Sequence, residues 1–293
     1  MTSDLYVSTG AFTASSLGEI LRTCRDHGID YVELSSGLQH APDFLAPVHA
    51  TPELAYLVHN YFPPPAEPFV LNLASTDSST LARSHAMARE AIDLAAQLGA
   101  PFYSVHSGFA LNLTPALLGN PAGQAAAAAH QHVSRDDAYA IFLRSVSQLA
   151  DHARSRSIRL LVENNVLSPI YLAKHGANPL LLCDADEILR FFRDLSDDSV
   201  GLLLDVGHAK VSATALGFAS ADFLTRVAPH IGAWHLSDND GIADQNRPLD
   251  ETAWFFPHLR EHAPVPIVLE IYRLTPGQLR EQLALVQRAL TPK

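Results

Sequence analysis

Eight short apolar runs recur along the sequence, and each has the length of one buried β-strand. Most are continuous stretches of Val, Leu, Ile and aromatic residues rather than alternations of polar and apolar residues. This pattern is typical of strands in a parallel sheet that is covered on both faces. The expected strands lie at residues 5–9, 31–35, 54–59, 102–106, 158–163, 200–205, 231–236 and 266–271.

Helical patterns separate most of these runs. The clearest spans residues 80–98, and Gly99 supplies its C-terminal stop. The other expected helices lie at residues 15–27, 134–155, 184–194, 251–261 and 276–290. No helix is assigned after Leu34 or after His208.

The alternation of strands and helices predicts an α/β protein with a parallel sheet. Eight such units in 293 residues average about 37 residues each, which is within the range of a TIM barrel. Because the sequence shows no interdomain linker, we expect residues 1–293 to form a single (β/α)8 barrel domain. Residues 110–133 form a long insertion after the fourth strand, and we expect either a lid over the site or a surface loop there.

Charge and cysteine content limit the partners that we expect. The chain has 20 basic and 31 acidic residues and a net charge of −11, so a nucleic-acid backbone would be repelled overall. Two cysteines are too few for a disulfide framework and favour a reducing compartment. The sequence shows neither a secretory signal pattern nor an apolar stretch of about 18 residues, so we expect a cytoplasmic protein without a membrane partner.

Acidic or imidazole side chains stand at the C-terminal ends of four of the apolar runs: Glu163, Asp205, His235 and Glu270. In α/β barrels these strand ends meet at the rim where the chemistry takes place. Three carboxylates and one imidazole form an oxygen-rich ligand set that suits Mn²⁺ or Mg²⁺ and is acceptable to Co²⁺ or Zn²⁺. The sequence therefore predicts a site for one divalent metal ion at this rim. No glycine-rich phosphate cradle occurs, so no nucleotide cofactor is implied.

Several of these segments resemble one known superfamily over nearly the whole chain and in the same order. It is the sugar phosphate isomerase/epimerase and apurinic endonuclease superfamily, the xylose isomerase-like TIM barrels. The most specific elements are D-x-x-H at 205–208, HLSDN at 235–239 and the glutamates that end the fifth and eighth strands; the others are VELSSG (32–37), LVHNYF (57–62), VLNLAS (70–75) and SVHSG (104–108).

The resemblance implies roles for these positions. In members that resemble ketose epimerases, the residues matching Glu163, Asp205, His235 and Glu270 bind one ion, commonly manganese, and the two glutamates also move protons. In members that resemble the endonucleases, His59 and His106 would join Glu163 in a second zinc site. Substrate binding, or a structural place at the rim, is the alternative for these two histidines. A homodimer is also implied, because barrels of this kind commonly pair.

A third zinc site of the endonucleases requires the D-x-x-H histidine and a later D-x-H pair. Here His208 is present, but residues 244–246 read DQN, so Asn246 stands in place of the second histidine. An amide oxygen is a poorer zinc ligand than imidazole. The sequence therefore predicts an incomplete three-zinc arrangement.

Four protein ligands leave two octahedral positions, which the carbonyl oxygen and adjacent hydroxyl of a ketose can fill. Glu163 and Glu270 would then transfer a proton from one face of the carbon to the other through a metal-stabilised enediolate. We therefore expect a metal-dependent isomerase or epimerase of a small sugar, keto-sugar or polyol derivative. A lyase or dehydratase on a similar substrate and a zinc phosphodiesterase are the alternatives.

The remaining candidates each have a structural alternative. His208 is expected to bind a substrate oxygen, and Arg247 and Arg273 would bind a substrate carboxylate or phosphate unless they pair with surface acids. Trp234 would line a sugar site or pack in the core. Glu33 also ends a strand, where a structural turn and a substrate contact are equally expected.

Overall fold

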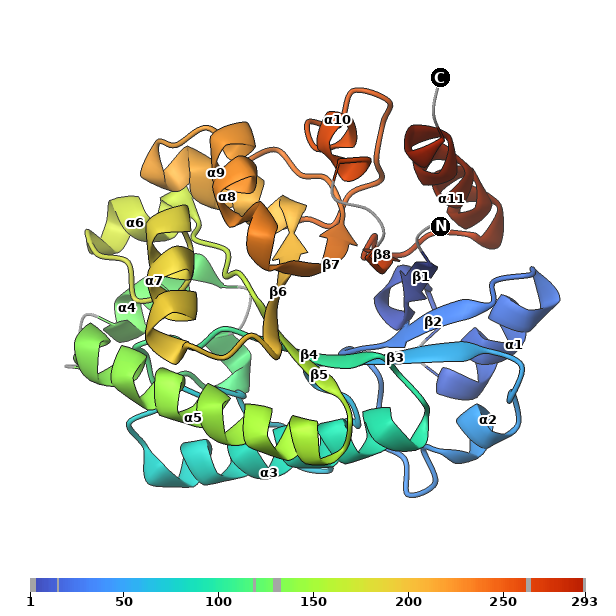
Figure 1. The fold of residues 1–293 in the computed structure, drawn as a ribbon, viewed down its shortest axis with the longest axis horizontal. Helices are drawn as coiled ribbons and strands as arrows, with labels where there is room; N and C mark the ends of the chain where they lie inside the picture. Colours follow the sequence, from blue (N-terminus) through green and yellow to red (C-terminus); the bar gives the residue numbers. More distant parts are fainter. Residues whose placement is uncertain (1–3, 15, 118–119, 129–132, 262–264, 292–293) are drawn as a thin grey trace.

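The computed structural model describes residues 4–14, 16–117, 120–128, 133–261 and 265–291. Eight parallel strands close into a barrel in sequence order, and β1 pairs with β8 to complete the ring (Figure 1). This confirms the predicted TIM barrel, and each strand lies within two residues of its expected bounds. The strands are β1 Leu5–Ser8, β2 Tyr31–Leu34, β3 Ala55–His59, β4 Phe102–His106, β5 Arg159–Glu163, β6 Val200–Asp205, β7 Ile231–Leu236 and β8 Ile267–Leu269.

Helices connect the strands and surround the barrel (Figure 1). Several begin where the sequence supplies a capping side chain: Asp77 accepts a hydrogen bond from the Thr80 N–H, and Thr275 and Gln278 form a capping box. The α-helices are α1 Leu17–Asp26, α2 Ala46–His49, α3 Ser78–Gln97, α4 Pro121–Ala128, α5 Arg135–Ser155, α6 Pro169–His175, α7 Ala185–Leu195, α8 Val206–Leu216, α9 Ser220–Val227, α10 Phe256–Leu259 and α11 Pro276–Leu290. Short 3-10 turns occur at Thr9–Ala11, Pro115–Leu117 and Ala228–His230.

The helix expected over 251–261 is largely wrong, because only Phe256–Leu259 is helical. Pro257 explains the late start. Its ring would clash with the carbonyl of Ala253 in a longer helix, whereas proline is accepted in the first turn. The segment after His208, for which no helix was assigned, belongs to α8, which follows Asp205 without an intervening loop.

The barrel interior is closed by side chains below the rim. A Cβ atom on Gly201 would lie 2.7 Å from Leu161 Cδ2, and one on Gly232 would lie 2.6 Å from the same atom. Glycine at these positions of β6 and β7 therefore lets Leu161 of β5 extend across the interior. Glu163, two residues further along β5, points to the same side, nearer the C-terminal rim.

Strand register places the candidate site residues at a common level. His106 pairs with Glu163 between β4 and β5, and Asp205 pairs with His235 between β6 and β7. Ser8 pairs with Glu33 between β1 and β2. Polar side chains from distant parts of the chain therefore meet at the C-terminal ends of the strands.

The insertion after β4 contributes α4, which packs alongside α6 through a small apolar cluster that includes Leu111, Leu167 and Tyr171. Residues 118–119 and 129–132 of the insertion lie outside the described part of the chain. Its role as a lid stays a prediction. Among the described residues, the helices are all too short or too polar to span a bilayer.

Candidate metal centre

The structure brings the four predicted ligands together. Glu163, Asp205, His235 and Glu270 each offer one ligand atom, and these atoms all lie within 4.8 Å of one another. His235 Nδ1 is 3.1 Å from Glu270 Oε2, 3.7 Å from Glu163 Oε1 and 3.9 Å from Asp205 Oδ2. All four residues are buried. One imidazole nitrogen thus faces three carboxylates that come from different strand ends.

The hydrogen bonding of this cluster fits a divalent cation. Both Glu163 carboxylate oxygens and Asp205 Oδ2 are buried and accept no hydrogen bond from the described residues. Buried carboxylate oxygens without partners are costly, and a cation would satisfy them. The ligand set of three carboxylates and one imidazole is suited to Mn²⁺ or Mg²⁺ and admits Zn²⁺ or Co²⁺.

Asp205 is held so that only one of its oxygens faces the cluster. Its backbone N–H donates to Asn164 Oδ1 at 2.8 Å, and Asn164 Nδ2 donates to the Asp205 carbonyl at 3.1 Å. Asp205 Oδ1 accepts a 2.6 Å hydrogen bond from the His208 N–H and so caps α8. The D-x-x-H motif is therefore a helix start that directs Oδ2 to the metal position.

A second group of potential ligands adjoins the first and shares Glu163 with it. His106 Nε2 is 3.2 Å and His59 Nε2 is 3.4 Å from Glu163 Oε2. His59 Nδ1 lies 2.9 Å from Ser104 Oγ, which orients its other nitrogen toward Glu163. The structure thus forms the group of His59, His106 and Glu163 that the resemblance implied as a second zinc site.

The described residues expected to hold a third zinc do not come together as a ligand group. His208 Nδ1 donates to the Asn164 carbonyl at 2.8 Å, and its Nε2 lies 3.3 Å from Asp244 Oδ2. Asn246 has a left-handed φ of 44°, and its side-chain Nδ2 donates to the Glu270 carbonyl. This amide supports the end of β8 instead of joining His208 and Asp244.

Burial and close charges shift the pKa values in the cluster strongly. Burial raises the pKa of Glu163 well above its usual value and that of Asp205 to about 6. Burial and the proximity of His235 lower the pKa of His59 to about 3. For His235 burial alone would lower the pKa, but the carboxylates of Glu33 and Glu270 hold it well above its usual value. Because metal ligands must be deprotonated, cation binding here would release protons.

The three weaker substrate-binding candidates differ in burial and in partners. Of the two alternatives for Trp234, the structure shows packing in the hydrophobic core: the side chain is 1% exposed, because neighbouring residues of a strand face opposite sides. Arg247 pairs with Asp240 at 3.4 Å, which is the surface alternative. Arg273 is exposed in the connection after β8 and has a positive φ of 59°.

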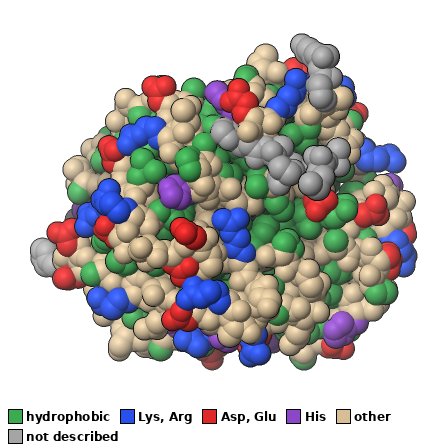
Figure 2. Space-filling view, viewed as in Figure 1, with side chains coloured by type: hydrophobic (Ala, Val, Ile, Leu, Met, Phe, Trp, Pro, Cys, Tyr) green, Lys and Arg blue, Asp and Glu red, His purple; other side chains and the backbone are tan. Residues whose placement is uncertain are grey.

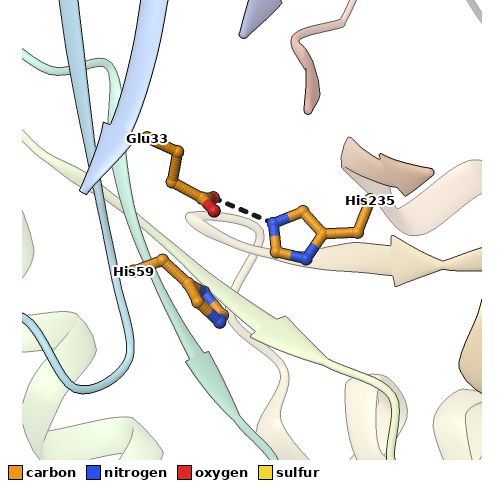
Figure 3. A group of neighbouring side chains, drawn as sticks. All are labelled: Glu33, His59 and His235. Carbon is orange, nitrogen blue, oxygen red and sulfur yellow. Dashed lines mark hydrogen bonds and ion pairs between the residues drawn. The ribbon is translucent and has the colours of Figure 1, made fainter. Parts of the chain in front are cut away.

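Sequence reasoning missed one partner of the cluster. Glu33 Oε2 lies 2.9 Å from His235 Nε2, and both side chains are fully buried (Figure 3). The available signal was that Glu33 lies near the end of a strand and is acidic, as are Glu163 and Asp205. Because of its neighbouring serines, a structural turn was expected as much as a substrate contact.

Comparison with known proteins identifies the family. A family model described as "xylose isomerase-like TIM barrel" matches residues 21–289. Similar solved structures include a D-tagatose 3-epimerase-like protein (TM-score 0.70, 19% identity, covering 98% of this chain and 100% of that chain). A 3-keto-D-glucoside 4-epimerase from E. coli, in its apo form, has a TM-score of 0.69 and 15% identity, covering 98% of this chain and 100% of that chain.

A xylose isomerase-like TIM barrel protein from Mycobacterium smegmatis, in complex with magnesium, is also similar (TM-score 0.65, 18% identity, covering 99% of this chain and 100% of that chain). No sequence among the curated proteins matches significantly. At these identities the structural matches establish the fold, and the family model establishes membership. The chain belongs to the xylose isomerase-like TIM barrel family.

Proposed function

We propose that the protein is a divalent-metal-dependent isomerase or epimerase of a small sugar, keto-sugar or polyol derivative. The observation that carries the proposal is the convergence of Glu163, Asp205, His235 and Glu270, with three buried carboxylate oxygens left unpaired among the described residues. The structural neighbours described as sugar epimerases support the choice of substrate class.

A bound divalent ion, with Mn²⁺ the expected species, would draw electron density from the substrate carbonyl and so acidify the adjacent C–H. Glu163 ends β5, whereas Glu270 directly follows β8, so the two carboxylates reach the substrate from different parts of the rim. One carboxylate removes the proton, and the other returns a proton to the opposite face, which inverts the carbon. We expect His208, beside Glu163, to hydrogen-bond a substrate oxygen through Nε2 in place of its contact with Asp244.

We infer a small, sugar-like partner rather than a nucleic acid. Lys210 near the rim is paired with Asp238, as Arg247 is with Asp240. On the face of the molecule that Figure 2 shows, Lys and Arg side chains are scattered among acidic ones. With a net charge of −11, the protein would bind an extended phosphate backbone poorly. We further propose a homodimer in the reducing cytoplasm, consistent with the two free buried cysteines.

Isotope exchange tests the proposal. The Mn²⁺-loaded protein is incubated with a panel of keto-sugars in D₂O, and NMR identifies any carbon that gains deuterium. We expect deuterium next to the carbonyl of the true substrate, and Glu163→Gln and Glu270→Gln should each abolish turnover. Glu90→Gln, which changes an exposed glutamate of α3, is the matched control and should leave the rate unchanged. A near-normal rate in either site variant would reject the acid and base roles.

The same proton removal also begins a lyase or dehydratase reaction. There, a leaving group on the next carbon would depart after the C–H bond breaks. Product analysis in the same NMR experiment separates the two, because epimerisation conserves the substrate formula and elimination releases water or another small molecule.

A zinc phosphodiesterase is a second candidate, favoured by the group of His59, His106 and Glu163. It would require two or three zinc ions per chain. Metal analysis of the purified protein discriminates the candidates: one ion per chain supports the isomerase, and two or three zinc ions support the phosphodiesterase.

A further inference from the structure

We propose that Glu33 is a positioning residue of the metal centre. Its carboxylate holds the His235 ring so that Nδ1 faces the three acidic ligands. The inference rests on the proposed metal site and adds to it a residue from β2, a strand that supplies none of the four ligands.

The geometry of the pair is the first support. Glu33 Oε2 lies 2.9 Å from His235 Nε2, and both residues are 0% exposed. Figure 3 shows the two side chains pointing toward each other from β2 and β7. Because a carboxylate accepts hydrogen bonds, the short contact places a proton on Nε2. Nδ1 is then the nitrogen left for a cation, and it is the one that faces Glu163, Asp205 and Glu270.

Ring orientation follows from the same contact. A 180° rotation of an imidazole about its Cβ–Cγ bond places a ring carbon where each ring nitrogen had been. A fixed acceptor on one side selects a single orientation and a single tautomer. An anionic acceptor also makes the opposite nitrogen a more basic ligand. Glu33 would therefore strengthen cation binding without touching the ion.

Glu33 could instead be a direct ligand, because Glu33, His59 and His235 also lie close enough to surround an ion. The hydrogen bonding argues against this. His235 Nε2 cannot donate to Glu33 and bind a cation at once. His59 has Nδ1 next to Ser104 Oγ and directs Nε2 toward Glu163. These nitrogens are already used in other contacts.

Burying the Glu33 carboxylate beside His235 costs stability, and this cost supports a functional role for Glu33. Glu33 Oε1 is buried and accepts no hydrogen bond among the described residues. A buried carboxylate with one unpaired oxygen contributes less to stability than an apolar side chain of similar size. A simple scaffold role therefore does not account for an acid at this position, whereas orienting a metal ligand does.

The test measures metal binding directly. Co²⁺ is titrated into metal-stripped wild type, Glu33→Ala and Glu33→Gln, followed by calorimetry and by the visible absorption of the bound ion. We expect the Co²⁺ affinity of E33A to fall by about 10–100-fold, with a changed absorption spectrum. E33Q retains an acceptor without the charge, so its affinity should lie between those of E33A and wild type.

Ser35→Ala is the matched control. Ser35 is also buried and directly follows β2, and its hydrogen bonds go to Ser8 and Thr9. S35A should bind Co²⁺ as wild type does. Circular dichroism of each variant establishes that it is folded. A purely structural role for Glu33 would lower the melting temperature and leave the affinity and spectrum of the folded protein unchanged.

A second measurement needs no variant. In the Zn²⁺-loaded wild type, ¹H–¹⁵N correlation spectra of the histidine rings should show His235 protonated at Nε2 and metal-bound at Nδ1. The opposite assignment, or an unchanged Co²⁺ affinity in E33A, would overturn the inference and leave the proposed function intact. Two ions in wild type but one in E33A would make Glu33 a ligand and also overturn it. If wild type binds no divalent ion, the proposed function fails as well.

Discussion

Replacing Asp205 with asparagine is expected to stabilise the metal-stripped protein at neutral pH while it destroys cation binding. Asp205 is 0% exposed, and burial raises its pKa from 3.8 to about 6. A difference of about two pH units corresponds to about 3 kcal/mol of unfolding free energy at about 1.4 kcal/mol per unit. This is the cost of the buried negative charge in the absence of a cation.

The structure also indicates what the substitution conserves. Asparagine keeps the oxygen that accepts the His208 N–H hydrogen bond at the start of α8. Its amide group replaces the unpaired Oδ2 and faces neighbouring carboxylates that can accept hydrogen bonds. For 293 residues the entropy of unfolding is about 0.6 kcal/mol per kelvin, so about 3 kcal/mol corresponds to a rise in Tm of about 5 °C. Cation affinity should fall by more than about 100-fold, since a direct ligand is lost.

The assay is thermal unfolding followed by circular dichroism in EDTA at several pH values. The folded pKa lies above the unfolded one, so the folded wild type binds a proton that the unfolded chain has released between about pH 4 and pH 6. The higher stability of D205N relative to wild type should therefore be absent below about pH 4 and complete above about pH 6. Asp205→Ala, which also removes the helix cap, should be less stable than D205N by about 1 kcal/mol or more. A metal-stripped D205N that is less stable than wild type at pH 8 would refute the reasoning.

Further predictions test the fold and the metal requirement. Asp77→Ala should lower the free energy of unfolding in urea by about 1 kcal/mol because α3 loses its cap, whereas Asp77→Asn should retain most of it. Cys24 and Cys183 should not react with a thiol reagent in the folded protein, because both are buried and burial raises the pKa of Cys24 to about 12; rapid labelling without urea would contradict this. Removing the metal with EDTA should stop deuterium incorporation, and Mn²⁺ should restore it; full exchange in EDTA would exclude a metal-dependent reaction.

The strands could be predicted from the sequence because both faces of a barrel strand are buried. Runs such as those in β5 and β6 need apolar residues at nearly every position until a polar residue reaches the rim. Strand order and register then follow from the closed parallel topology. This is why Glu163 and Asp205 could be assigned to one site although they are far apart in the sequence.

The helices around the barrel were less predictable. The segment before Pro257 has the spacing of a helix, but the proline restricts helical structure to the short α10. By contrast, α8 is buried along much of its length and has no polar face that would mark it as amphipathic.

The direction of individual side chains was the other feature that could not be predicted from the sequence. Trp234 and His235 are adjacent in the sequence, yet one packs in the core and the other faces the metal position. Glu33 is an acidic residue near a strand end, as the predicted ligands Glu163 and Glu270 are. However, it contacts Nε2 of His235, the nitrogen that does not face the metal position. Which nitrogen a histidine offers depends on distant partners, and no local pattern encodes that.

The most direct test of the central claim is a crystal structure of the Mn²⁺-loaded protein with anomalous diffraction data. We expect one strong anomalous peak within bonding distance of Glu163, Asp205, Glu270 and Nδ1 of His235. No peak at that point, or a peak bound by His59 and His106 without Asp205, would contradict it.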